Sequence, residues 1–124
     1  MTSPESTRAL PRFHLTSLAW PEVFSTGLTI EEAEFGEGGS VRPPFSASRF
    51  TVAPGGSTPP DTHAVAECWF VASGAALLVY DGQEIALRQG DIAVFAPNKT
   101  HQAFNEGNEA LVVFSTWWDV DDRP

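Results

Sequence analysis

Short runs of β-branched and aromatic residues recur at close spacing between Ser46 and Trp118, separated by turn signals rich in glycine, proline, asparagine and aspartate. The runs read SASRFTVA, ECWFVASG, AALLVYDG, QEIALRQG, DIAVFA, HQAFNEG and EALVVFSTWW. None of them shows a convincing helical period. Many short strands of this kind are typical of a barrel or sandwich, so we expect an all-β fold.

The dipeptide Asp81-Gly82 lies between two of these runs, ALLVY and QEIAL. Glycine adopts a positive φ at no steric cost, and Asp-Gly is well suited to a two-residue type I′ turn. The sequence therefore predicts a tight β-hairpin at this point.

The pattern ahead of these runs is weaker. LAWPEVFS favours a short edge strand interrupted by Pro21, and GLTIEEAEF alternates well enough for another strand. A chain of 124 residues fits one domain. We expect a flexible segment at 1–12, a single all-β domain at 13–118 and an acidic tail at 119–124.

The charge balance excludes several classes of partner. Seven Lys and Arg residues against 16 Asp and Glu give a formal net charge of -9. Phosphate binding needs clustered basic side chains, so we expect no nucleic acid and no membrane surface as partner.

Cys68 is the single cysteine, and no internal disulfide can form. No apolar run has the length of a signal peptide or a spanning helix, and we expect a cytoplasmic protein.

Three potential metal ligands follow a Gly/Pro turn within seven residues: Asp61, His63 and Glu67. Asp61 and His63 are two residues apart and project from one face of a strand. His63 and Glu67 are four apart, and a straight strand would separate them by about 13 Å. A bend between them is needed to bring both donors to one metal, and residues 64–66 are small enough to form that corner.

His101 opens a later run, after a turn through Pro97-Asn98. If the sheet closes on itself, His101 faces His63 and Glu67 across the barrel interior. Two imidazoles with one or two carboxylates suit a first-row divalent ion such as Fe(II), Mn(II), Ni(II) or Zn(II). The ligand types alone do not choose among these metals.

These two segments together resemble the paired motifs of the cupin family. The first cupin motif reads G-x5-H-x-H-x3-E-x6-G, and its spacings are matched by Gly55, Asp61, His63, Glu67 and Gly74, with Asp61 in place of the first histidine. The second reads G-x5-P-x-G-x2-H-x3-N. It is matched by Gly90, His101 and Asn105, while Ala96 and Asn98 replace the proline and the second glycine.

The resemblance implies a cupin-type antiparallel β-barrel, a double-stranded β-helix or jelly roll. It implies a divalent metal held by Asp61, His63, Glu67 and His101, a small-molecule substrate and a homodimer. Cupins include dioxygenases, decarboxylases, isomerases, polyketide cyclases and plain binding modules, so the fold does not fix the reaction.

The replacement at Asp61 leaves two roles open for this residue. As a fourth ligand, its carboxylate would bring the formal charge of the site near zero and make the metal a weaker Lewis acid. Alternatively, Asp61 accepts a hydrogen bond beside the metal or acts as a general base. His63, Glu67 and His101 would then form a two-histidine, one-carboxylate face with an open position.

We therefore expect a metal-dependent enzyme acting on a small organic molecule, either an oxygenase or a non-redox isomerase, cyclase or lyase. Asp61 and Arg49 are the candidate catalytic residues, because an inward-pointing Arg49 would hold a substrate carboxylate. A solvent-facing Arg49 is the alternative. Two other functions stay open: a non-catalytic binding module, and a metal-free epimerase-like enzyme with His63 as base. Cys68, next to Glu67, should point away from the site as a buried thiol.

Overall fold

The computed structural model describes residues 14–19, 27–35 and 42–120 of the chain. These residues form strands and no helix. The strands are β1 (His14–Ala19), β2 (Leu28–Glu34), β3 (Ser46–Val52), β4 (Ala66–Ser73), β5 (Ala75–Tyr80), β6 (Gln83–Arg88), β7 (Ile92–Phe95), β8 (His101–Phe104) and β9 (Leu111–Trp118). No helix in this part of the chain has the length and apolar character that crossing a membrane requires.

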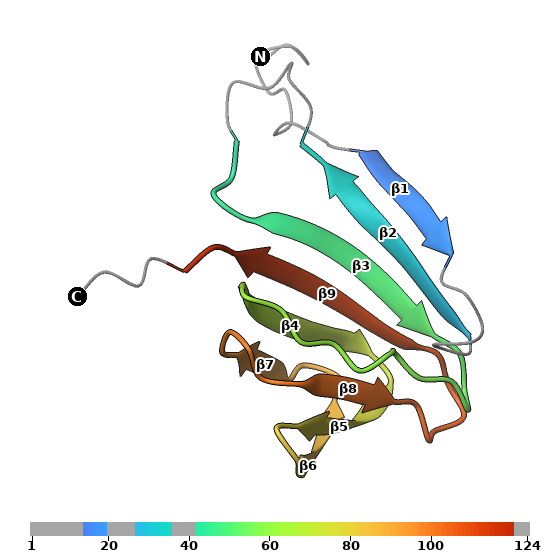
Figure 1. Cartoon of the computed structure of the whole chain (residues 1–124). Coiled ribbons are helices and arrows are strands. Elements are labelled where there is room, and N and C mark those ends of the chain that lie inside the picture. Colours follow the sequence, from blue (N-terminus) through green and yellow to red (C-terminus); the bar gives the residue numbers. More distant parts are fainter. Residues whose placement is uncertain (1–13, 20–26, 36–41, 121–124) are drawn as a thin grey trace, which may run out of the picture.

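The described strands form two antiparallel sheets (Figure 1). The larger sheet has the order β1-β2-β3-β9-β4-β7, and the smaller has the order β6-β5-β8. In Figure 1, β1, β2, β3 and β9 lie side by side, and the three strands of the smaller sheet are grouped apart from them. The expected all-β, antiparallel architecture is confirmed.

Each of the seven runs between Ser46 and Trp118 contains one strand, from β3 to β9. The weaker pattern GLTIEEAEF forms β2. In LAWPEVFS, Leu18 and Ala19 end β1, while 20–25 lie outside the described residues. The expected flexible segment at 1–12 and residues 121–124 of the expected acidic tail also lie outside them.

Alternation along the strands divides the side chains between an inner and an outer face. On β3, Ser48, Phe50 and Val52 are buried, whereas Arg49 and Thr51 are only partly buried. The inner face carries one apolar cluster: Leu28, Phe50, Val52, Trp69, Val71, Ala76, Leu78, Leu87, Phe95, Ala103, Leu111 and Val113. Burying one large side chain of this kind contributes about 1.5–3 kcal/mol, so this cluster holds the two sheets together.

The predicted hairpin is present between β5 and β6. Tyr80 pairs with Gln83, and the two residues between them have positive φ, 51° at Asp81 and 84° at Gly82. These are the backbone angles that a type I′ turn needs, and the prediction is confirmed.

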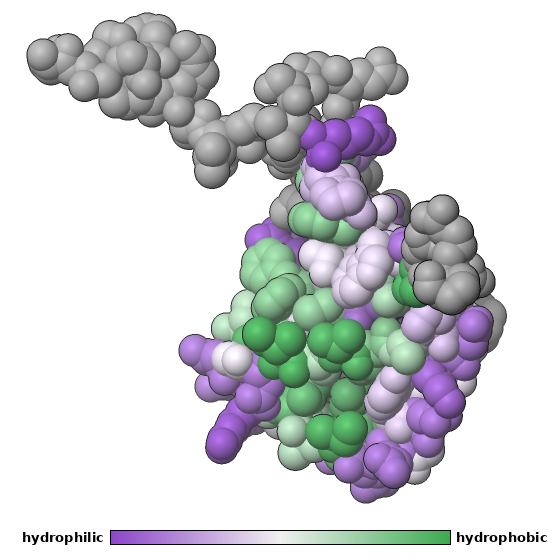
Figure 2. Space-filling model, turned by 90° about the vertical axis from the view of Figure 1, so that its left-hand side faces the viewer, coloured by the Kyte–Doolittle hydropathy of each residue, from purple (hydrophilic) through white to green (hydrophobic). Residues whose placement is uncertain are grey.

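Several large apolar side chains lie on the outer face of the larger sheet. Phe70 on β4, Ile92 and Val94 on β7, and Phe114 on β9 are all exposed. The register places Phe70 beside both Ile92 and Phe114 on the neighbouring strands. Figure 2 shows apolar side chains gathered in the middle of one face of the molecule, with hydrophilic residues on both sides.

Candidate metal centre

The connection from β3 to β4 carries two of the candidate ligands, Asp61 and His63. Asp61 forms an isolated antiparallel bridge with His101, the first residue of β8. The Asp61 N–H donates to the His101 carbonyl at 2.9 Å, and the His101 N–H donates to the Asp61 carbonyl at 3.0 Å. This bridge ties the two motif segments together and sets Asp61 beside His101.

His63 follows Asp61, and the chain bends at residues 64–65 before β4 begins. This bend is the corner expected between His63 and Glu67. The backbone N–H of Asn98 donates to the His63 carbonyl at 2.7 Å and so anchors the connection. Asn98 has a φ of 66°, a left-handed conformation that asparagine adopts more readily than most residues. Asn98 can therefore replace the motif glycine without loss of the turn.

Glu67 is buried near the start of β4 and lies against both imidazoles. Its Oε1 is 3.3 Å from His63 Nε2 and 3.1 Å from His101 Nε2. Its Oε2 accepts hydrogen bonds from Trp69 Nε1 at 2.7 Å and from Ser115 Oγ at 2.5 Å. One carboxylate oxygen is thus anchored by the sheet, and the other faces the histidines.

The His101 ring is held by aromatic contacts. It stacks on Phe95 with ring centroids 4.4 Å apart and an angle of 3° between the planes. Trp69 approaches the same ring edge-on, with centroids 5.4 Å apart. His101 is only 2% exposed, whereas the side chain of His63 is 37% exposed. His63 therefore lies on the open side of the cluster, and His101 forms its buried wall.

The two carboxyl groups of the cluster have opposite pKa shifts. Burial tends to raise the pKa of Glu67, but contact with His101 and hydrogen bonds from Ser115 and Trp69 outweigh it and hold the pKa below its ordinary value. Burial raises the pKa of Asp61, and the neighbouring His101 and His63 offset this only in part. The surroundings of Glu67 thus favour its ionised form, whereas those of Asp61 disfavour ionisation.

The geometry around Glu67 Oε1 fits a metal ion. Within the described residues this buried oxygen has no hydrogen-bond partner, although two imidazole nitrogens lie close to it. A buried acceptor without a donor costs free energy. Ligand atoms that share one metal at 2.0–2.2 Å lie about 2.8–3.6 Å from one another, from octahedral to tetrahedral angles, and this range includes the two spacings seen here. A divalent cation between these donors would satisfy the oxygen.

A second grouping contains Asp61 in place of Glu67. One ligand atom from each of Asp61, His63 and His101 lies within 4.8 Å of the other two. The two groupings share both histidines and differ in the carboxylate. Glu67 Oε1 lies 3.1 and 3.3 Å from the two imidazoles and its carboxylate is anchored through Oε2, so we take Glu67 as a ligand beside the Asp61, His63 and His101 grouping. Asp61 is left close enough to serve as a fourth ligand or as a base.

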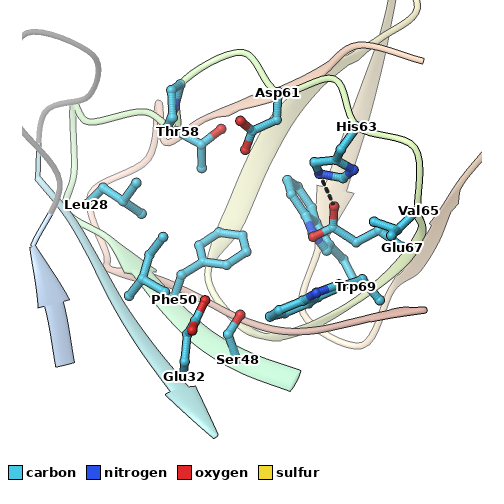
Figure 3. Close-up of a pocket in the computed structure, with 13 residues that line it drawn as sticks. Leu28, Glu32, Ser48, Phe50, Thr58, Asp61, His63, Val65, Glu67 and Trp69 are labelled. Carbon is cyan, nitrogen blue, oxygen red and sulfur yellow. Dashed lines mark hydrogen bonds and ion pairs between the residues drawn. The ribbon is translucent and has the colours of Figure 1, made fainter. Parts of the chain in front are cut away.

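A cavity of about 380 Å³ opens next to this cluster (Figure 3). Its walls come from β2, β3, the β3–β4 connection, β4 and the end of β9, and its lining includes Asp61, His63, Glu67, Phe50 and Trp69. Figure 3 shows the Asp61 and His63 side chains directed into this space. A small organic molecule therefore has access to the histidine and carboxylate groups.

The structure does not bring Arg49 to the cavity. Ser48 and Phe50 line it, and Arg49 between them belongs to the opposite face of β3. There its guanidinium pairs with Glu31, with Nη2 2.7 Å and Nε 2.8 Å from Oε1. Arg49 thus points away from the cavity, in line with the solvent-facing alternative given for it. The geometry does not support a catalytic role for Arg49.

Cys68 is buried on β4 and is absent from the cavity lining, as expected. Burial raises the pKa of its thiol, and the charge of Glu67 raises it further. The side chain of His14 lies outside the part of the chain that the structure describes.

Two features of the site were missing from the sequence analysis. Ser115 anchors Glu67, and Glu32 and Ser48 line the cavity. Alternation along the strands could have predicted these residues, because alternate side chains of a strand lie on the same face. Glu32 follows Leu28 and Ile30 at this spacing, and Ser115 follows Leu111 and Val113.

Comparisons with known proteins agree with this architecture. The family profile described as Cupin_2, Cupin domain, matches residues 48–117. A Cupin 2 conserved barrel domain protein from Salinispora arenicola CNS-205 is 31% identical, with 75% of this chain and 76% of that chain covered and a TM-score of 0.67. A predicted oxalate decarboxylase from Thermotoga maritima is 16% identical, with 87% and 94% covered and a TM-score of 0.70. A cupin-2 domain protein from Rhodospirillum rubrum is 19% identical, with 94% and 76% covered and a TM-score of 0.71.

Proposed function

The chain belongs to the cupin family, and from this premise we propose that it is a divalent-metal-dependent enzyme acting on a small organic molecule. The family resemblance and the cupin-type β-barrel expected from the sequence are both confirmed. Metal dependence and catalysis are the proposal. They rest on the side chains gathered at the cavity.

One observation carries the proposal: the buried Glu67 Oε1 lies 3.1 and 3.3 Å from two imidazole nitrogens and has no hydrogen-bond donor among the described residues. A structural carboxylate in the core would be paired through both oxygens. Here Oε2 accepts hydrogen bonds from Trp69 and Ser115, whereas Oε1 faces only the two imidazoles. We assign His63, Glu67 and His101 as ligands, with Asp61 as fourth ligand or base.

A bound metal would polarise a substrate oxygen or bind O2. The protein's own residues would do the rest. The apolar lining of the cavity, including Leu28, Ile30 and Phe50, would exclude water from the bound molecule. Asp61, with a raised pKa, would hold or accept a proton beside the metal if it is not itself a ligand.

The comparisons leave the reaction open between oxygenation and non-redox isomerisation, cyclisation or elimination. The Thermotoga maritima protein is described as a predicted oxalate decarboxylase, but identity of 16% supports a shared fold and not a shared substrate. The homodimer and the cytoplasmic location remain predictions.

Metal analysis of protein purified without an affinity tag tests the proposal. After removal of loosely bound ions, we expect about one divalent ion per chain in the native protein and much less in Glu67→Gln and His63→Ala. Arg49→Gln is the matched control, because its ion pair with Glu31 lies on the opposite face of β3.

Oxygen uptake and product analysis across a panel of small molecules would then separate redox from non-redox chemistry. A protein that carries no metal contradicts the proposal. If such a protein keeps its activity in the presence of a chelator, the metal-free reading with His63 as base is correct. A protein that binds metal and ligand without turnover is a binding module.

A further inference from the structure

The cavity has a second polar end, away from the histidines. Glu32 on β2 is paired in register with Ser48 on β3, and both line the cavity. Residues paired in this way have Cβ atoms about 4.5–5.5 Å apart, so their side chains are neighbours. Figure 3 shows Glu32 and Ser48 together on the side of the cavity opposite Asp61.

Neither of these two side chains has a partner within the described residues. The Glu32 side chain is exposed at the rim and makes no ion pair or hydrogen bond with another described side chain. Ser48 is only 7% exposed, yet its hydroxyl also makes no hydrogen bond there. Ser48 is thus nine-tenths buried as a residue, and it lines the cavity with a hydroxyl that is free to hydrogen-bond a polar group of a ligand at this end.

The rest of the β2–β3 wall of the cavity is apolar. Ile30 is paired with Phe50, and Leu28 with Val52, on the strands that also carry Glu32 and Ser48. Leu28, Ile30, Phe50 and Trp69 line the cavity, and Ser48 is paired in register with Ser115, the residue that donates to Glu67. A ligand that fills the cavity therefore needs an apolar body against this wall.

The cavity lining is also acidic and lacks basic groups. Glu32, Asp61 and Glu67 belong to it, and no Lys or Arg does among the described residues. Arg49 is held on the other face by Glu31, and Arg42 lines a separate hollow. Even with a dication beside Asp61 and Glu67, no described Lys or Arg compensates the carboxylate of Glu32 in the lining. Like charges placed together oppose binding, so an anionic ligand is disfavoured.

We propose that this cavity selects a small, mostly apolar molecule carrying a protonated amine, held by the Glu32 carboxylate and the Ser48 hydroxyl. The bound molecule is a substrate only if the protein is an enzyme, and in this respect the inference rests on the proposed function. The share of the amine preference that belongs to Glu32 is measured by substituting Glu32, with or without the metal.

The test is calorimetric binding of three probes of similar shape to chelator-treated protein: benzylamine, benzyl alcohol and benzoate. Without metal, benzoate cannot bind by coordination, so the comparison reports the charge of the cavity. We expect benzylamine to bind at least about ten-fold more tightly than benzoate. In Glu32→Gln this preference should fall by about five-fold, the size expected for one exposed ion pair.

Charge reversal makes the test sharper. Glu32→Lys should reverse the order and favour benzoate, whereas Glu84→Lys, an exposed position on β6 outside the cavity lining, should leave it unchanged. Binding of benzoate as tightly as benzylamine, no binding of any probe, or an equal effect of the two substitutions overturns the inference. Metal content is measured on the same samples, so an amine preference in a protein that never holds metal would contradict the proposed function alone.

Discussion

Glu67 shows how one residue can be shared between structure and chemistry. Its side chain is buried near the start of β4, yet only one of its oxygens is used by the fold. Trp69 and Ser115 fix that oxygen, and the carboxylate plane is thereby set toward the imidazoles. Hydrogen bonds of this kind orient metal ligands and tune their basicity.

Ser115→Ala tests this positioning role. Loss of the 2.5 Å hydrogen bond to Glu67 Oε2 should leave the carboxylate free to turn and weaken metal affinity by about 10–100-fold. Titration with a competing chromophoric chelator would measure the change in Kd. The control is Thr116→Ala, the next residue on β9, which is paired with Cys68 on the outer face. Equal metal affinity in both variants would show that Ser115 does not position Glu67.

At the scale of elements, tight turns decide where the strands begin and end. Gly74 separates β4 from β5 with a φ of 83°, and β4 carries Glu67 while β5 pairs with β8, which carries His101. A Cβ at Gly74 would lie 2.5 Å from the Ala110 carbonyl oxygen and 2.9 Å from Leu111 Cα. This motif glycine is therefore required by both its backbone angle and its close neighbour.

Gly74→Ala should lower the free energy of unfolding by about 2–4 kcal/mol, combining left-handed strain with displacement of the backbone at Ala110. Gly82→Ala is the matched control. Gly82 has a φ of 84° but nothing within 4 Å of the added Cβ, so only the strain of about 1–2 kcal/mol applies. Urea denaturation of the two variants measures the difference. A loss at Gly74 no larger than that at Gly82 would contradict the role of the close contact.

Over the whole molecule, local patterns predicted the strands well because β-branched runs and glycine turns act within a few residues. The proximity of His63, Glu67 and His101 was predicted from the spacing of the two cupin motifs, because that spacing is typical of a sheet that closes on itself. The pairing of Glu32 with Ser48 and of Trp69 with Ser115 depends on register between distant strands, which no local window contains. The outward face of Arg49 could have been predicted, since inward Phe50 next to it fixes the alternation on β3.

The homodimer remains a prediction at this scale. β7 is the edge of the larger sheet as described, and its Ile92 and Val94 are 60% and 62% exposed. Light scattering on purified protein at micromolar concentration should give a mass near twice the 13.4 kDa of one chain. A mass of one chain under the same conditions would contradict the prediction.

The most direct test of the account is anomalous diffraction from crystals of the protein with its metal, recorded at the absorption edge of that metal. We predict one strong peak bonded to His63, Glu67 and His101 at about 2.0–2.3 Å, with Asp61 either completing the ligands or beside an open position. A peak elsewhere, or none after soaking in zinc or ferrous salts, would show that these side chains do not form a metal centre.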